Sequence, residues 1–182
     1  MCSYAGLEAI FNIQSVKKSA VCLLTDKEEV GSMGNTGMES RFFENMVANL
    51  INLQEDYNDL KIRRAIENSQ VLSADVNAAF DPTFPEVMEK MNSAKIAGGV
   101  TISKYTGSRG KGGCNDANAE FLSEIRQIFD KNGIIWQTGE LGKTDQGGGG
   151  TIAYILANLG AEVVDCGTSM HSMHAPIELV SK

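Results

Sequence analysis

Two kinds of hydrophobic periodicity alternate along this chain. Short apolar runs bounded by glycine, serine or asparagine predict strands, and longer segments with apolar residues three or four positions apart predict helices. The predicted strands cover residues 19–25, 70–74, 99–105, 134–138 and 162–166. The predicted helices cover residues 2–14, 38–53, 59–68 and 115–131, and a last helix opens from the glycines at 147–150 and runs to 159. Strands separated by helices predict an α/β fold, with a mostly parallel or mixed sheet and helices on both faces.

Acidic side chains and the two histidines of the chain follow three of the predicted strands. They are Glu28 and Glu29 after the first strand, Asp75 after the second, and His171 and His174 after the last. Loops at strand ends reach solvent from a rigid scaffold, so side chains there can meet in one crevice. Carboxylate and imidazole without paired thiolates are the ligand set of a hydrolytic zinc, manganese or cobalt site.

The same residues have a simpler interpretation. An acidic pair in a turn is common on protein surfaces, and a histidine near the surface is often an incidental polar residue. The recurrence of acids and imidazole at several strand ends is what favours the metal site. Adjacent residues of an extended chain point to opposite sides, so Glu28 and Glu29 are expected to have different roles.

Composition and charge exclude several classes of protein. A length of 182 residues, of which 42% are hydrophobic and 21% charged, is ordinary for one globular domain. The net charge of −7 argues against a surface for nucleic acid or anionic membrane. With no apolar run of transmembrane length and no signal peptide, a cytoplasmic protein is expected. The four cysteines lack paired spacing, which predicts reduced thiols.

Two glycine-containing segments resemble phosphate loops to different degrees. Residues 137–144 follow a predicted strand, but Gln137 stands where such a loop needs glycine, and no helix can begin directly after Thr144. The glycines at 147–150 lead into an apolar helix, whose free N–H groups favour an anion or a carbonyl group. Gly149 and Gly150 are therefore predicted to bind substrate, and a glycine-rich connection without a ligand is the alternative.

Five motifs together resemble the aspartyl aminopeptidase / aminopeptidase I family, in its bacterial branch. They are DKEEVGS at 26–32, SADVNAAFDP at 73–82, KYTGSRGKGG at 104–113, ELGKTDQGGGGTIAYILA at 140–157 and SMHAP at 172–176. This resemblance covers almost the whole chain. It implies a phosphorylase/hydrolase-like zinc exopeptidase architecture with a co-catalytic two-metal site, acting on the N-terminal bond of peptides.

The resemblance also implies a role for each candidate residue. Glu28 would be the general base, which must stay free of the metals. Glu29 and His174 would bind one divalent metal ion and Asp75 the other, with zinc expected and cobalt or manganese as alternatives. Lys111 would meet an acidic first side chain of the substrate.

The chain departs from the family pattern at its ends. In the family, a histidine and a metal-bridging aspartate lie upstream of the segment that resembles residues 2–10, and an oligomerising domain is inserted between them. This sequence has none of these three features. Both ends therefore look cut, and residues 1–182 are expected to be a partial catalytic domain of a family whose full-length members are homo-oligomers. The missing ligands predict weak metal binding and little peptidase activity.

Three functions stay open from the sequence. The first is the catalytic domain of a metalloaminopeptidase, which the five motifs favour. The second is a catalytically inactive remnant that binds peptides or assembles with a complete subunit. The third is a nucleotide-binding domain, which Gln137 disfavours.

Overall fold

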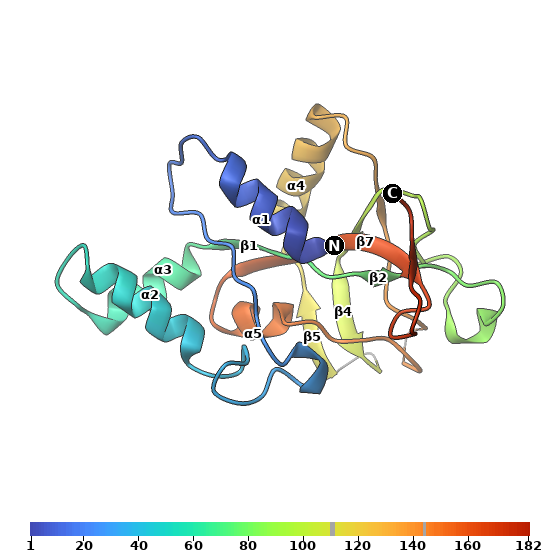
Figure 1. Cartoon of the computed structure of the whole chain (residues 1–182), viewed down its shortest axis with the longest axis horizontal. Coiled ribbons are helices and arrows are strands. Elements are labelled where there is room, and N and C mark those ends of the chain that lie inside the picture. Colours follow the sequence, from blue (N-terminus) through green and yellow to red (C-terminus); the bar gives the residue numbers. More distant parts are fainter. Residues whose placement is uncertain (110–111, 144) are drawn as a thin grey trace.

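A long strand, β7 (Glu162–His171), is the centre of a mixed sheet. The computed structural model describes residues 1–109, 112–143 and 145–182. Within them the sheet has the order β1-β7-β3-β6, and the short strands β2 and β8 also pair with β7 (Figure 1). The other strands are β1 Gln70–Ser73, β2 Asn77–Ala78, β3 Val100–Ser103, β4 Tyr105–Ser108, β5 Gly112–Asp116, β6 Trp136–Thr138 and β8 Leu179–Val180. The helices are α1 Cys2–Asn12, α2 Phe42–Asn52, α3 Asp59–Glu67, α4 Ala119–Lys131 and α5 Ala153–Asn158, with short 3-10 turns at Glu28–Val30 and Pro85–Val87.

The pairing directions make this sheet mixed, as the sequence predicted. β1 and β2 both run parallel to β7, whereas β3 and β8 run antiparallel to it. β3 in turn pairs in parallel with β6. The predicted α/β class with a mixed sheet is therefore confirmed.

Two adjacent valines show why helices cover both faces of β7. Neighbouring residues of a strand point to opposite faces, so Val163 and Val164 enter different cores. Val163 packs in a cluster with Ile155 of α5, while Val164 packs with Phe121 and Ile125 of α4. Figure 1 shows α4 on one side of β7 and α5 on the other. Each side chain buried in this way stabilises the fold by about 1.5–3 kcal/mol.

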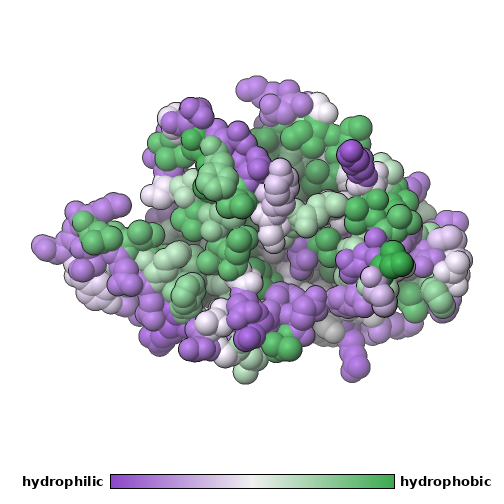
Figure 2. All heavy atoms as spheres, in the orientation of Figure 1, coloured by the Kyte–Doolittle hydropathy of each residue, from purple (hydrophilic) through white to green (hydrophobic). Residues whose placement is uncertain are grey.

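The face that carries α1 has a large apolar surface. No residue of α1 is fully buried, and Tyr4 and Phe11 are 66% and 72% exposed. Figure 2 shows hydrophobic residues gathered over this part of the molecule. None of the described helices is both long and apolar enough to cross a membrane. Within α1, Cys2 and Ile10 are partly buried.

A hairpin that the hydrophobic pattern did not predict lies beside the main sheet. β4 and β5 pair antiparallel, and the glycine run extends this pairing along β4. The N–H of Gly107 donates to the carbonyl of Gly149 at 3.1 Å, and the N–H of Arg109 donates to the carbonyl of Gly147 at 2.9 Å. The glycine run therefore lies along β4, and α5 begins only at Ala153.

The structure differs from the prediction at residues 19–25 and at the start of the helix predicted over 115–131. Residues 19–25 form no strand, because no described segment pairs with them, and an isolated bridge between Asp26 and Gly37 follows. α4 begins at Ala119 because residues 115–116 belong to β5, and its cap is Asn118. α3 begins at Asp59, as predicted, and is capped by the side chain of Asn58.

Candidate functional site

Glu28 and Glu29 lie on a closed 3-10 turn that follows the apolar run. The chain enters this turn through Lys27, whose φ of 65° is in the left-handed region that non-glycine residues rarely adopt. The N–H of Ser32 closes the turn on the carbonyl of Lys27 at 2.8 Å. Asp26 fixes the other side by accepting a hydrogen bond from the Thr36 hydroxyl at 2.8 Å. Residues held in this way against their backbone preference cluster at functional sites.

Asp75 lies where the pairing with β7 is interrupted. β1 ends at Ser73 and β2 begins at Asn77, and both strands pair with β7. The Asp75 carboxylate is half-buried and accepts a hydrogen bond from the N–H of Val76 at 2.7 Å. The break in the ladder therefore leaves the carboxylate to be oriented by the next peptide group.

His174 reaches the acidic turn from the far end of the chain. Its φ of 67° is also left-handed, and its N–H donates to the Glu178 carboxylate at 2.9 Å. His174 Nε2 lies 3.2 Å from Glu29 Oε1, and the two side chains are 67% and 74% exposed. An exposed pair contributes about 1 kcal/mol or less to stability. Both groups are therefore open to a further partner.

Glu28 lies among the charges of the other three candidates. Partial burial raises the pKa of Glu28, and the negative charges of Asp75 and Glu29 raise it further. The charge of His174 opposes this shift. The charges that act on Glu28 thus come from three segments that are distant in sequence, and two of these residues, Glu29 and His174, are in direct contact.

The converging donors suit a zinc ion in kind, but not in number. Glu29 and His174 offer a carboxylate oxygen and an imidazole nitrogen, a combination that zinc accepts. Across residues 1–109, 112–143 and 145–182, no three His, Cys, Asp or Glu side chains are grouped so that they could hold an ion. Zinc sites use at least three protein ligands. Among the described residues, the donors therefore number fewer than a zinc site needs.

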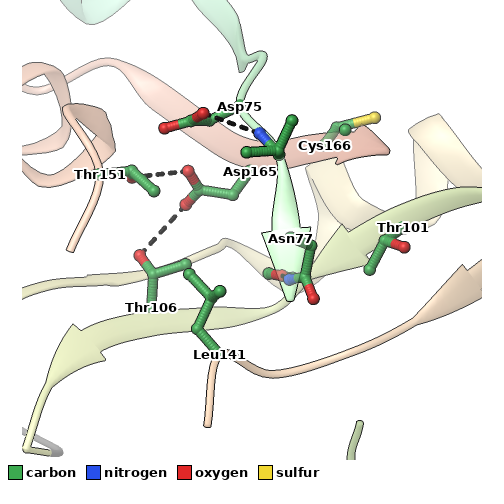
Figure 3. A pocket seen from close by; sticks show the side chains of 11 residues that line it. Asp75, Asn77, Thr101, Thr106, Leu141, Thr151, Asp165 and Cys166 are labelled. Carbon is green, nitrogen blue, oxygen red and sulfur yellow. Dashed lines mark hydrogen bonds between the residues drawn. The ribbon is translucent and has the colours of Figure 1, made fainter. Parts of the chain in front are cut away.

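A small polar pocket lies beside Asp75 and contains an acid that the sequence pattern missed. Its lining includes Asn77, Thr106, Thr151 and Asp165 (Figure 3). Asp165 is 5% exposed and accepts hydrogen bonds from the hydroxyls of Thr151 at 2.6 Å and Thr106 at 3.2 Å. Burial raises the pKa of Asp165, and the hydrogen-bond donors oppose this effect. In the sequence, the burial of Asp165 could have been inferred from its place inside the apolar run EVVDCG.

Glu140 is a second acid that was not singled out. Burial raises its pKa to about 7, against a hydrogen bond from the Tyr105 N–H and the positive charge of Lys104. It lines a pocket with Gly107 and Gly147. The motif ELGK at 140–143 contains this acid, but nothing in its polarity indicated burial.

The predicted substrate-binding residues have different outcomes. Lys111 lies outside the described residues. Gly149 accepts the hydrogen bond from Gly107, and a Cβ added to Gly150 would lie 3.5 Å from the carbonyl oxygen of Gly113. Both glycines therefore lie along the hairpin, and the helix expected to open from the glycine run begins only at Ala153. Their binding of substrate stays a prediction.

His171 takes a place distinct from that of His174. It is the last residue of β7 and pairs with Leu179 of β8. Its Nδ1 is buried and has no hydrogen-bond partner among the residues that the structure describes. Hydrogen bonds from Thr83 lower the pKa of Asp81, and the charge of His171 lowers it further.

Known proteins resemble this chain over its whole length. The family model described as aminopeptidase I zinc metalloprotease (M18) matches residues 1–182. A probable M18 family aminopeptidase 1 of Clostridium acetobutylicum is 57% identical over 182 residues, which are 100% of this chain and 39% of that protein. Its counterpart in Thermotoga maritima is 40% identical over 183 residues, covering 100% of this chain and 40% of that protein.

Solved structures share the fold. Aminopeptidase I from C. acetobutylicum matches with a TM-score of 0.87 and 54% identity, over 99% of this chain and 38% of its own. The M18 aminopeptidase from T. maritima matches with a TM-score of 0.91 and 41% identity, over 99% of this chain and 40% of its own. The S. cerevesiae mApe1 dodecamer, 24% identical with a TM-score of 0.68 over 95% of this chain and 38% of its own, shows the fold alone.

The matches cover all of this chain but only part of each relative. The chain spans about two fifths of the length of the relatives that it matches. On its own side, the coverage is complete, and the motifs at 26–32, 73–82 and 172–176 lie within the matched region. The chain belongs to the aminopeptidase I zinc metalloprotease (M18) family.

Proposed function

We propose that this chain supplies the general base and part of the metal-ligand set of an aminopeptidase that hydrolyses the N-terminal peptide bond of peptides. The observation that carries the proposal is the contact between Glu29 and His174 beside Glu28, whose pKa the charges of Asp75, Glu29 and His174 shift. The family is one of zinc metalloproteases, which supports zinc and hydrolytic chemistry.

Glu29 and His174 would hold one divalent ion, and Asp75 would contribute to holding a second. Zinc is the expected metal at both positions, with cobalt or manganese as alternatives. When bound, two such ions polarise the scissile carbonyl and lower the pKa of the attacking water. The open position of Glu29 and His174, at 74% and 67% exposure, suits residues that receive an ion from solvent.

Glu28 would take the proton of the attacking water and later give it to the leaving amine. A group with this double role needs a pKa raised towards the working pH. Burial and the neighbouring carboxylates act on Glu28 in that direction. Glu28 is half-buried whereas Glu29 is exposed, which suits a sheltered base beside an accessible ligand.

The substrate would be a peptide with a free N-terminus. Lys111 remains the proposed contact for an acidic first side chain, and Gly149 and Gly150 remain proposed contacts for the substrate backbone. The two glycines would act through their backbone groups beside β4, where Gly149 accepts a hydrogen bond from the Gly107 N–H. Full-length members of the family are proposed to work as homo-oligomers.

The test combines zinc calorimetry with turnover of aspartyl and leucyl chromogenic substrates by the chain and its Glu28→Gln variant. With two converging ligands, we expect weak zinc binding and little turnover. Glu28→Gln should remove the turnover that is detected while leaving zinc affinity unchanged. Tight binding of two zinc ions with fast turnover would show that other residues complete the site, and turnover that survives Glu28→Gln would exclude Glu28 as the base.

A second candidate function is a non-catalytic one, in which the chain binds peptides or assembles with a complete subunit. It is favoured by the lack of a three-donor group among the described residues. In that case Glu28→Gln would change no measured property, and binding of peptides or of a complete M18 aminopeptidase would persist without zinc.

A further inference from the structure

Asp75 faces one particular residue of β7. The pairing is in the same register on both sides of the break, since Ser73 pairs with Asp165 and Asn77 pairs with Ser169. Counting inward from either side places Asp75 opposite Gly167. Both residues line the same small pocket, in which Figure 3 labels Asp75.

The two backbones approach so closely that no side chain fits between them. A Cβ built on Gly167 would lie 1.5 Å from the carbonyl oxygen of Asp75, 2.6 Å from its carbonyl carbon and 3.4 Å from its nitrogen. Real Cβ contacts are essentially never shorter than 3.0 Å. The φ of Gly167 is outside the left-handed region, so the requirement for glycine here is one of space.

The approach is confined to the interrupted part of the ladder. Residues 74–76 leave the regular pairing with β7, and Gly167 pairs on its other side with Thr101 of β3. Thr101 is 1% exposed, so on the side opposite Asp75 the neighbouring strand β3 packs tightly against β7. A side chain at position 167 would therefore displace Asp75 rather than β7.

We propose that Gly167 is a positioning residue for Asp75: its lack of a side chain lets the Asp75 backbone rest on β7 and so places the carboxylate at the metal site. The inference rests on the proposed role of Asp75 as a metal ligand. An alanine at position 167 would place its Cβ 1.5 Å from the Asp75 carbonyl oxygen. To reach an allowed separation, the Asp75 backbone would have to move by more than the few tenths of an ångström that a metal-ligand position tolerates.

The first experiment is a double-mutant cycle read out by zinc chloride calorimetry on the full chain. Gly167→Ala is expected to weaken zinc binding about tenfold or more, the range found for residues that orient ligands. In an Asp75→Asn background the same substitution should change zinc affinity by less than about twofold, because the ligand on which it acts is already lost.

A control variant separates positioning from general damage. A Cβ on Gly139 would lie 2.7 Å from the Ala94 Cβ, so Gly139→Ala also strains a buried contact, but it touches none of the proposed ligands. It should lower the melting temperature and leave zinc affinity within about twofold of wild type. If Gly139→Ala weakens zinc binding as much as Gly167→Ala does, the effect is general and the proposal is overturned.

A second measurement does not need Gly167→Ala to fold. In a chain labelled with ¹⁵N-glycine, zinc chloride should shift the amide signal of Gly167 and leave that of Gly139 in place. The Gly167 shift should disappear in Asp75→Asn. If zinc does not shift the Gly167 signal although Asp75→Asn still weakens zinc binding, the positioning role alone is overturned. If Asp75→Asn leaves zinc affinity unchanged, the ligand role of Asp75 fails, and this inference fails with it.

Discussion

His174 and Glu29 are 145 positions apart in sequence, yet Nε2 of one lies 3.2 Å from Oε1 of the other. Neither residue is in a regular strand: Glu29 lies on a 3-10 turn, and His174 lies in the loop after β7. Left-handed backbone at Lys27 and at His174 itself directs the two segments. The contact is therefore set by two unusual local conformations, each at an exposed place where little packing energy fixes it.

The first prediction concerns the imidazole. His174→Ala should weaken zinc binding by at least about tenfold, because half of the converging donor pair is lost. It should change the free energy of unfolding by less than about 0.5 kcal/mol, since the pair is exposed. Zinc calorimetry and urea unfolding measure the two effects.

His171→Ala is the matched control for this change. His171 is half-buried at the end of β7, so its loss should lower stability while leaving zinc affinity as in wild type. Equal effects of the two histidines on zinc affinity would contradict the assignment of His174 alone.

The second prediction concerns the closure of the acidic turn. A Cβ on Gly37 would lie 2.0 Å from the carbonyl oxygen of Ser32 and 2.6 Å from that of Met33, so Gly37→Ala must open the loop. We expect a loss of about 2 kcal/mol or more in the free energy of unfolding. Gly147→Ala, whose nearest contact would be at 3.6 Å, should stay within about 0.5 kcal/mol of wild type. Similar stabilities for both variants, in urea unfolding, would show that the loop adapts freely.

The sequence predicted the fold class well because the apolar runs of β1, β3 and β7 have partners within the chain. Residues 19–25 have an equally apolar run, but a strand exists only where another strand pairs with it, and composition does not reveal the partner. The hairpin of β4 and β5 was missed for the opposite reason. Its glycines carry no side-chain alternation, so backbone pairing leaves no pattern to detect.

The positions of the candidate site residues can be compared with the sequence pattern, while their roles stay predictions. Polar residues after apolar runs indicated Glu28, Asp75 and His174, and in the structure the charges of Asp75 and His174 both act on the pKa of Glu28. The importance of Gly167 could not be read from the sequence, because it depends on a register that only the folded sheet defines. Asp165 was missed because burial of a carboxylate depends on distant donors such as Thr106.

The third prediction tests how the buried Asp165 is held. The Thr151 hydroxyl donates to Asp165 and also accepts the N–H of Ala153 at the start of α5. Thr151→Val removes both hydrogen bonds and should lower the free energy of unfolding by about 2–3 kcal/mol. Thr151→Ser keeps the hydroxyl and should cost about 1 kcal/mol or less. If serine and valine cost the same in urea unfolding, the hydroxyl does not stabilise the fold.

The fourth prediction concerns the pH dependence of stability. Folding raises the pKa of Glu140 from 4.5 to about 7, mainly by burial. Between these values the folded chain binds more protons than the unfolded chain, so this residue lowers the free energy of unfolding as pH rises through the window. After allowance for partial exposure to solvent, the loss between pH 4.5 and 8 is about 1–2 kcal/mol.

Glu140→Gln should remove this loss, because glutamine stays neutral and can still accept the hydrogen bond from the Tyr105 N–H. Relative to wild type, the variant should therefore be more stable at pH 8 by about 1–2 kcal/mol and nearly equal at pH 5. Glu67→Gln, at an exposed position on α3, should keep the pH profile of wild type. Urea unfolding at both pH values decides the matter: if Glu140→Gln and wild type lose the same stability between pH 5 and pH 8, the carboxyl group of Glu140 is already ionised in the folded chain throughout that range.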